Sequence, residues 1–152
     1  MIQMNRRKWW IAAAILWMAV IFMFTQVPYS TGKNTSDTLQ KILVFLHIDG
    51  VDHAVVDQLN FIVRKLTHIT VFGFLAFLFF KCLEACRFAY ILSWILTVVY
   101  AMTDEYHQSF MPGRTASIKD VFLFDSVGAF LVLLVTFFIV RKIGEKTRST
   151  LG

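Results

Sequence analysis

The chain has 152 residues, of which 57% are hydrophobic and 16% are charged, and its formal net charge is +5. A soluble domain is usually about 45–50% apolar and about 25% charged, so this composition argues for a membrane protein. The apolar residues form long runs and do not alternate with polar ones, which argues against a transmembrane β-barrel and predicts an all-α protein. Most of the positive charge flanks these runs, so we expect it to orient the protein in a membrane rather than to bind nucleic acid.

The first apolar run extends from Trp9 to Val27 and carries no charge. Its length is close to the ~20 residues that a membrane-spanning helix needs. Three basic residues precede the run, and the segment Thr25–Tyr29 at its end is a poor cleavage site for a signal peptidase. We therefore expect an uncleaved first span at residues 9–27 that starts on the cytoplasmic side.

Residues 28–65 are more polar and form the predicted loop between the first and second spans. Two amphipathic patterns within this loop, at residues 39–46 and 51–62, are too short or too polar to cross a membrane. We expect both to form helices that lie on the membrane surface or pack against the spanning bundle.

Three further apolar runs predict spans at residues 66–83, 88–106 and 121–140. The chain, residues 1–152, is then a single all-α membrane domain with about four transmembrane helices and an extracytoplasmic, amphipathic helical loop. Cys82 and Cys86 have no second Cys or His pair nearby to complete a zinc site, so we expect ordinary helix residues.

The distribution of Lys and Arg predicts the topology. If the chain starts inside the cell, its cytoplasmic segments hold nine of the 15 Lys and Arg residues in three dense clusters. The other six are spread over longer outer segments. Because basic residues favour the cytoplasmic side, we expect both termini to face the cytoplasm.

A cluster of polar and ionisable side chains is then expected near the outer face of the membrane. Its members come from separate parts of the sequence, namely Lys65, His68, Asp104, Glu105, His107, Gln108, Arg114, Asp120 and Asp125. Ionisable groups at membrane depth are costly unless they are paired or hydrated, so we expect these side chains to be grouped. Gly128 follows Asp125 by three positions and would let a neighbouring helix come close.

The residue types in this cluster suggest two kinds of chemistry. Arg and Lys beside His suit phosphate binding, and carboxylates with His suit acid–base catalysis or a divalent metal. We take His68, Asp104 and Glu105 as catalytic candidates. The substrate-binding candidates are Lys65, Gln108, Arg114, Asp120 and Asp125. The same charges could instead form buried ion pairs that fix helix positions, and no set of metal ligands is assigned.

Several motifs together resemble the VanZ-like family of small bacterial membrane proteins. They are Arg64-Lys65-Leu66-Thr67-His68, Asp104-Glu105-Tyr106-His107-Gln108, Phe110-Met111-Pro112-Gly113-Arg114, Asp120-Val121 and Gly128. The resemblance extends from about residue 20 to about residue 140, and one departure is Asp125, where the family usually has Asn. It implies a multi-pass protein of the bacterial cytoplasmic membrane. For the founding member it implies a link to low-level resistance to teicoplanin-class antibiotics.

Three functional hypotheses follow. In the first, the outer cluster binds or acts on a phosphate-bearing lipid or a cell-envelope precursor, with Arg114 and Lys65 holding the phosphate. In the second, the protein is a non-enzymatic shield or partner protein whose polar cluster is structural. In the third, it is a small transporter or proton relay. The sequence leaves the reaction, any divalent metal and the oligomeric state open.

Overall fold

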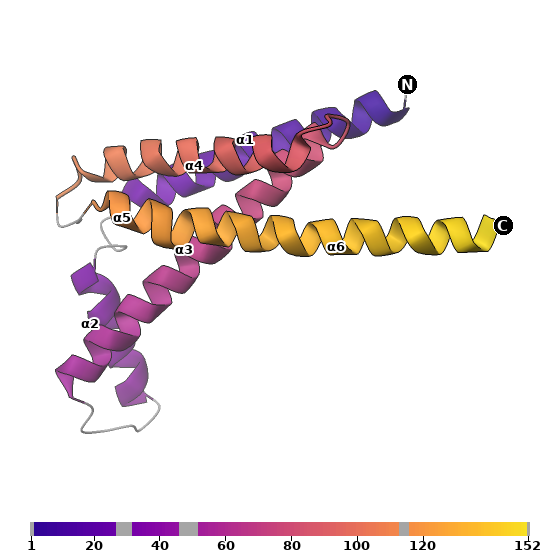
Figure 1. Cartoon of the computed structure of the whole chain (residues 1–152). Helices are drawn as coiled ribbons and strands as arrows, with labels where there is room; N and C mark the ends of the chain where they lie inside the picture. The colour runs from indigo at the N-terminus through magenta and orange to yellow at the C-terminus, as the bar shows by residue number, and fades with distance from the viewer. Residues whose placement is uncertain (1, 27–31, 46–51, 113–115, 152) are drawn as a thin grey trace.

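The computed structural model describes residues 2–26, 32–45, 52–112 and 116–151, and the regular elements in these ranges are all helices (Figure 1). The prediction of an all-α fold is therefore confirmed for the described residues. The elements are α1 (Ile2–Gln26), α2 (Gly32–Phe45), α3 (His53–Leu83), α4 (Ala89–Gln108), α5 (Ile118–Asp120), the π-helical turn η2 (Val121–Asp125) and α6 (Ser126–Leu151).

Helix α3 is the centre of the fold, because α1, α2, α4 and α6 all pack against it. It crosses the bundle at an angle, while α2 lies beside its N-terminal part and away from the other helices (Figure 1). The two described ends of the chain lie at the same end of the molecule, and α6 extends well beyond the bundle there (Figure 1).

The start of α3 differs from the expectation of two separate segments. The segment that we expected to form a surface helix at residues 51–62 is, from His53 onward, the first part of α3. Asp52 begins the helix, because its side chain accepts a hydrogen bond from the Ala54 backbone N–H (3.3 Å). Within α3, no Gly or Pro occurs before Gly73, so nothing interrupts the helix where its polar part meets its apolar part. The other expected amphipathic helix is found as α2.

Three helical stretches are long and apolar enough to cross a membrane, namely Arg6–Gln26, His53–Leu83 and Ile118–Thr150. Many of their large apolar side chains point outward, as lipid-facing residues would; Trp9 is 73% exposed and Phe138 is 58% exposed. Helix α4 has 20 residues but ends in a polar segment, and it is not among the three. Three of the four predicted spans thus have helices of this kind, and the span at residues 88–106 stays a prediction.

Two glycines allow α3 and α6 to pack in direct contact. A Cβ atom on Gly128 would lie 2.4 Å from the Ile69 carbonyl oxygen, and one on Gly73 would lie 2.7 Å from a methyl group of Val132. These distances are far below van der Waals contact, so only glycine fits at Gly128 without moving the backbone of α3. The prediction that Gly128 permits a close helix contact is confirmed.

Candidate functional site

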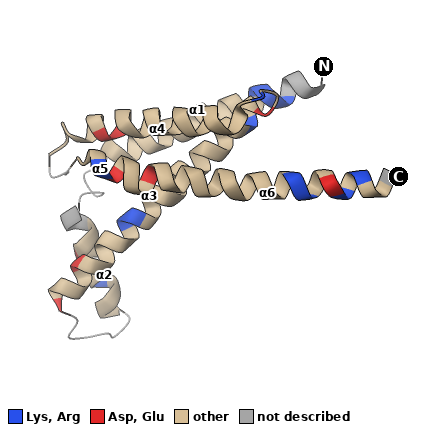
Figure 2. Ribbon diagram, in the orientation of Figure 1, with Lys and Arg blue, Asp and Glu red and all other residues tan. Residues whose placement is uncertain are grey.

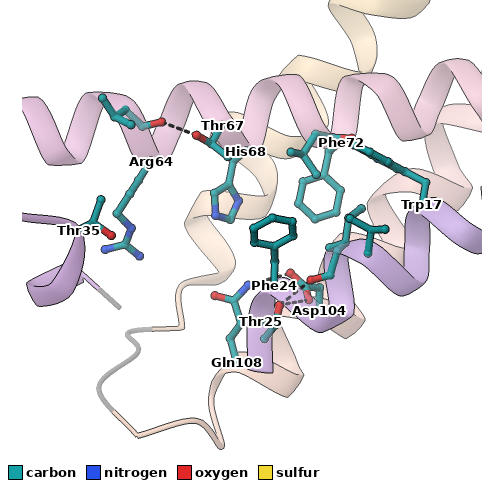
Figure 3. Close-up of a pocket in the computed structure, with 14 residues that line it drawn as sticks. Trp17, Phe24, Thr25, Thr35, Arg64, Thr67, His68, Phe72, Asp104 and Gln108 are labelled. Atoms are coloured by element: carbon teal, nitrogen blue, oxygen red, sulfur yellow. Dashed lines mark hydrogen bonds between the residues drawn. The ribbon is translucent and has the colours of Figure 1, made fainter. Parts of the chain in front are cut away.

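A cavity of about 280 Å³ lies between α1, α3 and α4, with α2 at its edge (Figure 3). We call it the bundle cavity. Its lining residues are Trp17, Val20, Ile21, Phe24, Thr25, Thr35, Val63, Arg64, Thr67, His68, Val71, Phe72, Asp104 and Gln108. Trp17 and Phe72 lie at one end of the view and Arg64 and Thr35 at the other (Figure 3). The cavity therefore has an apolar end and a polar end.

The apolar end is fixed by a contact between α1 and α3. The Trp17 indole Nε1–H donates a hydrogen bond to the Val71 carbonyl oxygen over 3.1 Å, and the Trp17 ring packs edge-on against Phe74. Phe72 is only 2% exposed. Because an indole N–H that lies inside a protein needs an acceptor, this bond also sets the orientation of the ring in the cavity wall.

Between the two ends lies a carboxylate that is held by two helices (Figure 3). Asp104 of α4 is 6% exposed. Its Oδ1 accepts a hydrogen bond from the Thr25 hydroxyl of α1 over 2.8 Å, and its Oδ2 accepts one from the Gln108 side-chain amide over 2.7 Å. A buried carboxylate with two donors has a fixed position. Two of the predicted residues, Asp104 and Gln108, are thus brought together as their four-residue spacing suggested.

His68 lies between the bundle cavity and the turn η2, which precedes α6. Its imidazole lines the bundle cavity, and its Nδ1 lies 2.9 Å from Oδ1 of Asp125, which is 1% exposed. Three positions earlier on α3, Lys65 pairs with Asp120 over 2.5 Å, and its ammonium lies over the ring of Phe124. Lys65 does not line the cavity.

The π turn explains how Asp120 and Asp125 both reach α3. Residues five apart on a regular α-helix are separated by about 140° around its axis. The wider turn η2 between them, with its i→i+5 pattern, brings such residues closer to one face. Both carboxylates can therefore contact α3 side chains that are three positions apart.

The remaining predicted residues lie elsewhere. Glu105 is 5% exposed, accepts a hydrogen bond from the Ser117 backbone N–H and does not line the bundle cavity. Arg114 falls outside the described residues. In the described ranges, no three His, Cys, Asp or Glu side chains are grouped so that they could hold a metal ion. The predicted cluster is therefore divided between the cavity wall, two ion pairs and a loop contact.

Arg64 is the main residue that we did not select from the sequence. It is half-buried and lines the bundle cavity, and no ion pair in the described part of the chain involves it. The sequence favours its neighbour Lys65, because Lys65 is three positions from His68 on the same helix face. A longer pattern in the sequence indicates that Arg64 shares a helix face with His68. The residues at the three-and-four spacing of that face are Asp57, Asn60, Arg64, Thr67, His68 and Val71.

The Lys65–Asp120 pair should stabilise the bundle modestly, because both side chains are partly exposed to solvent. We expect Lys65→Gln and Asp120→Asn each to lower the free energy of unfolding by about 0.5–1 kcal/mol. The double variant should lose less than the sum of the two single losses. Melting temperatures of the four proteins in detergent measure this, and strictly additive losses would show that the pair contributes nothing.

Comparison with known proteins identifies a family. A protein-family model described as VanZ/LLP1 matches residues 10–141. No curated protein and no solved structure matches the chain. The match confirms the resemblance that the motifs indicated, and it covers all the cavity-lining residues.

Proposed function

We propose that this chain, which belongs to the VanZ/LLP1 family, is a four-pass protein of the bacterial cytoplasmic membrane that binds a phosphate-bearing lipid or envelope precursor in the bundle cavity. The polar end of the cavity takes the phosphate, with Arg64 as its main cationic partner. The apolar end takes part of the hydrocarbon chain. A contribution to teicoplanin-class antibiotic tolerance follows from altered handling of such a molecule at the cell envelope.

The observation that carries the proposal is the change in the cavity wall along its length. Trp17, Val71 and Phe72 line one end, Arg64 lines the other, and Asp104 and Gln108 lie between them (Figure 3). A lipid phosphate has the same division between an apolar chain and an anionic head. The guanidinium fork of arginine binds phosphate oxygens in pairs, which a lysine ammonium does not do.

Charge and geometry support the orientation. Figure 2 shows basic residues at the start of α1, at the connection between α3 and α4, and in the last part of α6. All of these lie on the side of the molecule where the two termini lie. With the positive-inside rule, this end is cytoplasmic. The polar end of the cavity then faces outward, near the depth of the outer head groups. Helix α4, with 20 residues, is about 30 Å long and matches the hydrocarbon core of a bilayer.

A structural role remains the second candidate for part of the cluster. Two contacts support it: the Lys65–Asp120 pair and the hydrogen bonds of Asp104 both join different elements. Under this hypothesis these charges hold the helices together and the protein acts as a shield or partner. Arg64 separates the two hypotheses, because it makes no ion pair in the described ranges and yet lines the cavity.

Arg64→Ala should weaken binding of a short-chain phosphatidic acid by about tenfold, because a charge-assisted hydrogen-bonding partner of the phosphate is lost. Isothermal titration of purified protein in a neutral detergent measures this. The matched control is Arg141→Ala, which removes an exposed arginine in the second half of α6, outside both cavities, and should leave the affinity unchanged. Teicoplanin tolerance of cells at equal protein abundance should fall with Arg64→Ala alone. Equal affinities of wild type and Arg64→Ala would contradict the proposal.

A further inference from the structure

A second cavity, of about 480 Å³, lies between α2 and the first turns of α3. We call it the α2–α3 cavity. Its polar wall includes Ser36 and Asp37 from α2 and Asp57 and Asn60 from α3, and Arg64 lines it as well. Because Arg64 also lines the bundle cavity, the two cavities share this side chain. A molecule whose phosphate is bound by Arg64 therefore has room on both sides of that phosphate.

Hydrogen bonds fix the wall of the α2–α3 cavity. The Asn60 side-chain amide donates to the Ser36 hydroxyl over 2.8 Å, and that hydroxyl donates to Oδ1 of Asp57 over 3.1 Å. This chain of bonds ties α2 to α3 and holds one oxygen of the Asp57 carboxylate. The carboxylate is therefore positioned before any ligand arrives.

The charges that line this cavity beyond Arg64 are mainly negative. Asp37 and Asp57 are both exposed, and neither forms an ion pair within the ranges that the structure describes. The other ionisable residue in the wall is His53. An anionic group placed here would meet two carboxylates, whereas a cationic group would be attracted by both.

We propose that the α2–α3 cavity binds the ammonium group of a zwitterionic phospholipid head group whose phosphate is bound by Arg64. The order of charges on α3 matches such a head group. Asp57 precedes Arg64 by seven residues, which is two helical turns and about 10 Å along one face. The acyl chain then leaves the phosphate on the other side and enters the bundle cavity. This inference rests on the proposed function, to which it adds the chemistry of the head group.

The test compares two soluble lipids that differ only beyond the phosphate, dihexanoyl phosphatidylethanolamine and dihexanoyl phosphatidylglycerol. Titration calorimetry of the full chain in neutral detergent should give about fivefold tighter binding of the ethanolamine lipid. The double variant Asp37→Asn/Asp57→Asn should lose this preference. It should keep its affinity for the glycerol lipid, because Arg64 and the bundle cavity are unchanged. O-phosphoethanolamine, titrated alone, tells whether the head group suffices without an acyl chain.

Controls separate this inference from a folding defect and from the proposed function. The Asn side chain at position 57 keeps an oxygen for the Ser36 hydroxyl, so the unliganded melting temperature should not change. Glu145→Gln removes an acidic side chain on α6, outside both cavities, and should keep the preference. Equal binding of the two lipids, or tighter binding of the glycerol lipid, would overturn the ammonium site alone if Arg64→Ala still weakens both. Absence of binding by either lipid would overturn both proposals.

Discussion

Gly128→Ala is expected to destabilise the protein more than any other single methyl addition at a described glycine. The added Cβ would lie 2.4 Å from the Ile69 carbonyl oxygen and 2.7 Å from the Ile69 Cα. Both are backbone atoms, so no side-chain rotation relieves the contact and α3 must move away from α6. We expect a loss of about 1–3 kcal/mol or more in the free energy of unfolding, as for other overpacked sites. Thermal melting in detergent measures it.

Gly144 provides the matched control on the same helix. A Cβ on Gly144 would meet no atom within 4 Å. Gly144→Ala should therefore raise the stability by about 0.5–1 kcal/mol, because alanine favours a helix more than glycine does. The two substitutions are chemically identical and should have opposite signs. A similar melting temperature for Gly128→Ala and wild type would contradict the direct contact between α3 and α6.

Asp104→Ala should be the most destabilising change among the polar residues in the wall of the bundle cavity. It removes the acceptor of hydrogen bonds from Thr25 and Gln108, which lie on two helices. Losing hydrogen bonds to a buried charged acceptor costs about 1–3 kcal/mol. Asp104→Asn should cost much less, because the amide oxygen can still accept from Thr25 and the Gln108 amide can turn to accept from the new amide. Melting temperatures of both variants measure the difference.

One further variant makes this second prediction specific. Thr25→Val removes one donor, and its effect should not add to that of Asp104→Ala, because both break the same bond. A coupling free energy of about 1 kcal/mol is expected. Fully additive effects would show that the contact between α1 and α4 is not made. If Asp104→Asn melts like wild type but binds phosphatidic acid with altered affinity, the carboxylate charge acts on the ligand rather than on the fold.

Much of this fold could be predicted from the sequence, because hydrophobic runs and the spacing of Asp104, Gln108 and Gly128 are local signals. The continuity of α3 could not be predicted from hydropathy. The polar first part of α3 has the pattern of a separate surface helix. In the structure it packs against α2 and continues into the apolar part as one helix. Nothing local indicates that neighbouring residues 64 and 65 face different partners. Successive helical residues point about 100° apart, so Arg64 lines the cavities while Lys65 reaches Asp120.

The residues that Asp120 and Asp125 contact also could not be predicted from the sequence. A regular helical period places these two carboxylates on different sides of the helix. No residue between them is a sequence signal for a π turn. The sequence nevertheless ranks both as candidates, because charges near a membrane need partners. What tertiary structure adds is the identity of those partners, Lys65 and His68.

The π turn has a consequence for how this helix can change during evolution. Deleting one residue from a regular helix rotates all that follows by about 100° and would move Ala129 and Leu133 out of the core. Within η2, a deletion can be absorbed by returning the wide turn to an ordinary one, so the later part of the helix keeps its orientation. Asp120 and the carboxylate of Asp125 would then be four residues apart, about 40° around the axis of a regular helix. Loss of a single residue within η2 would therefore leave Asp120 on the side of α3, with Lys65 as its partner, and the later part of the helix as it was.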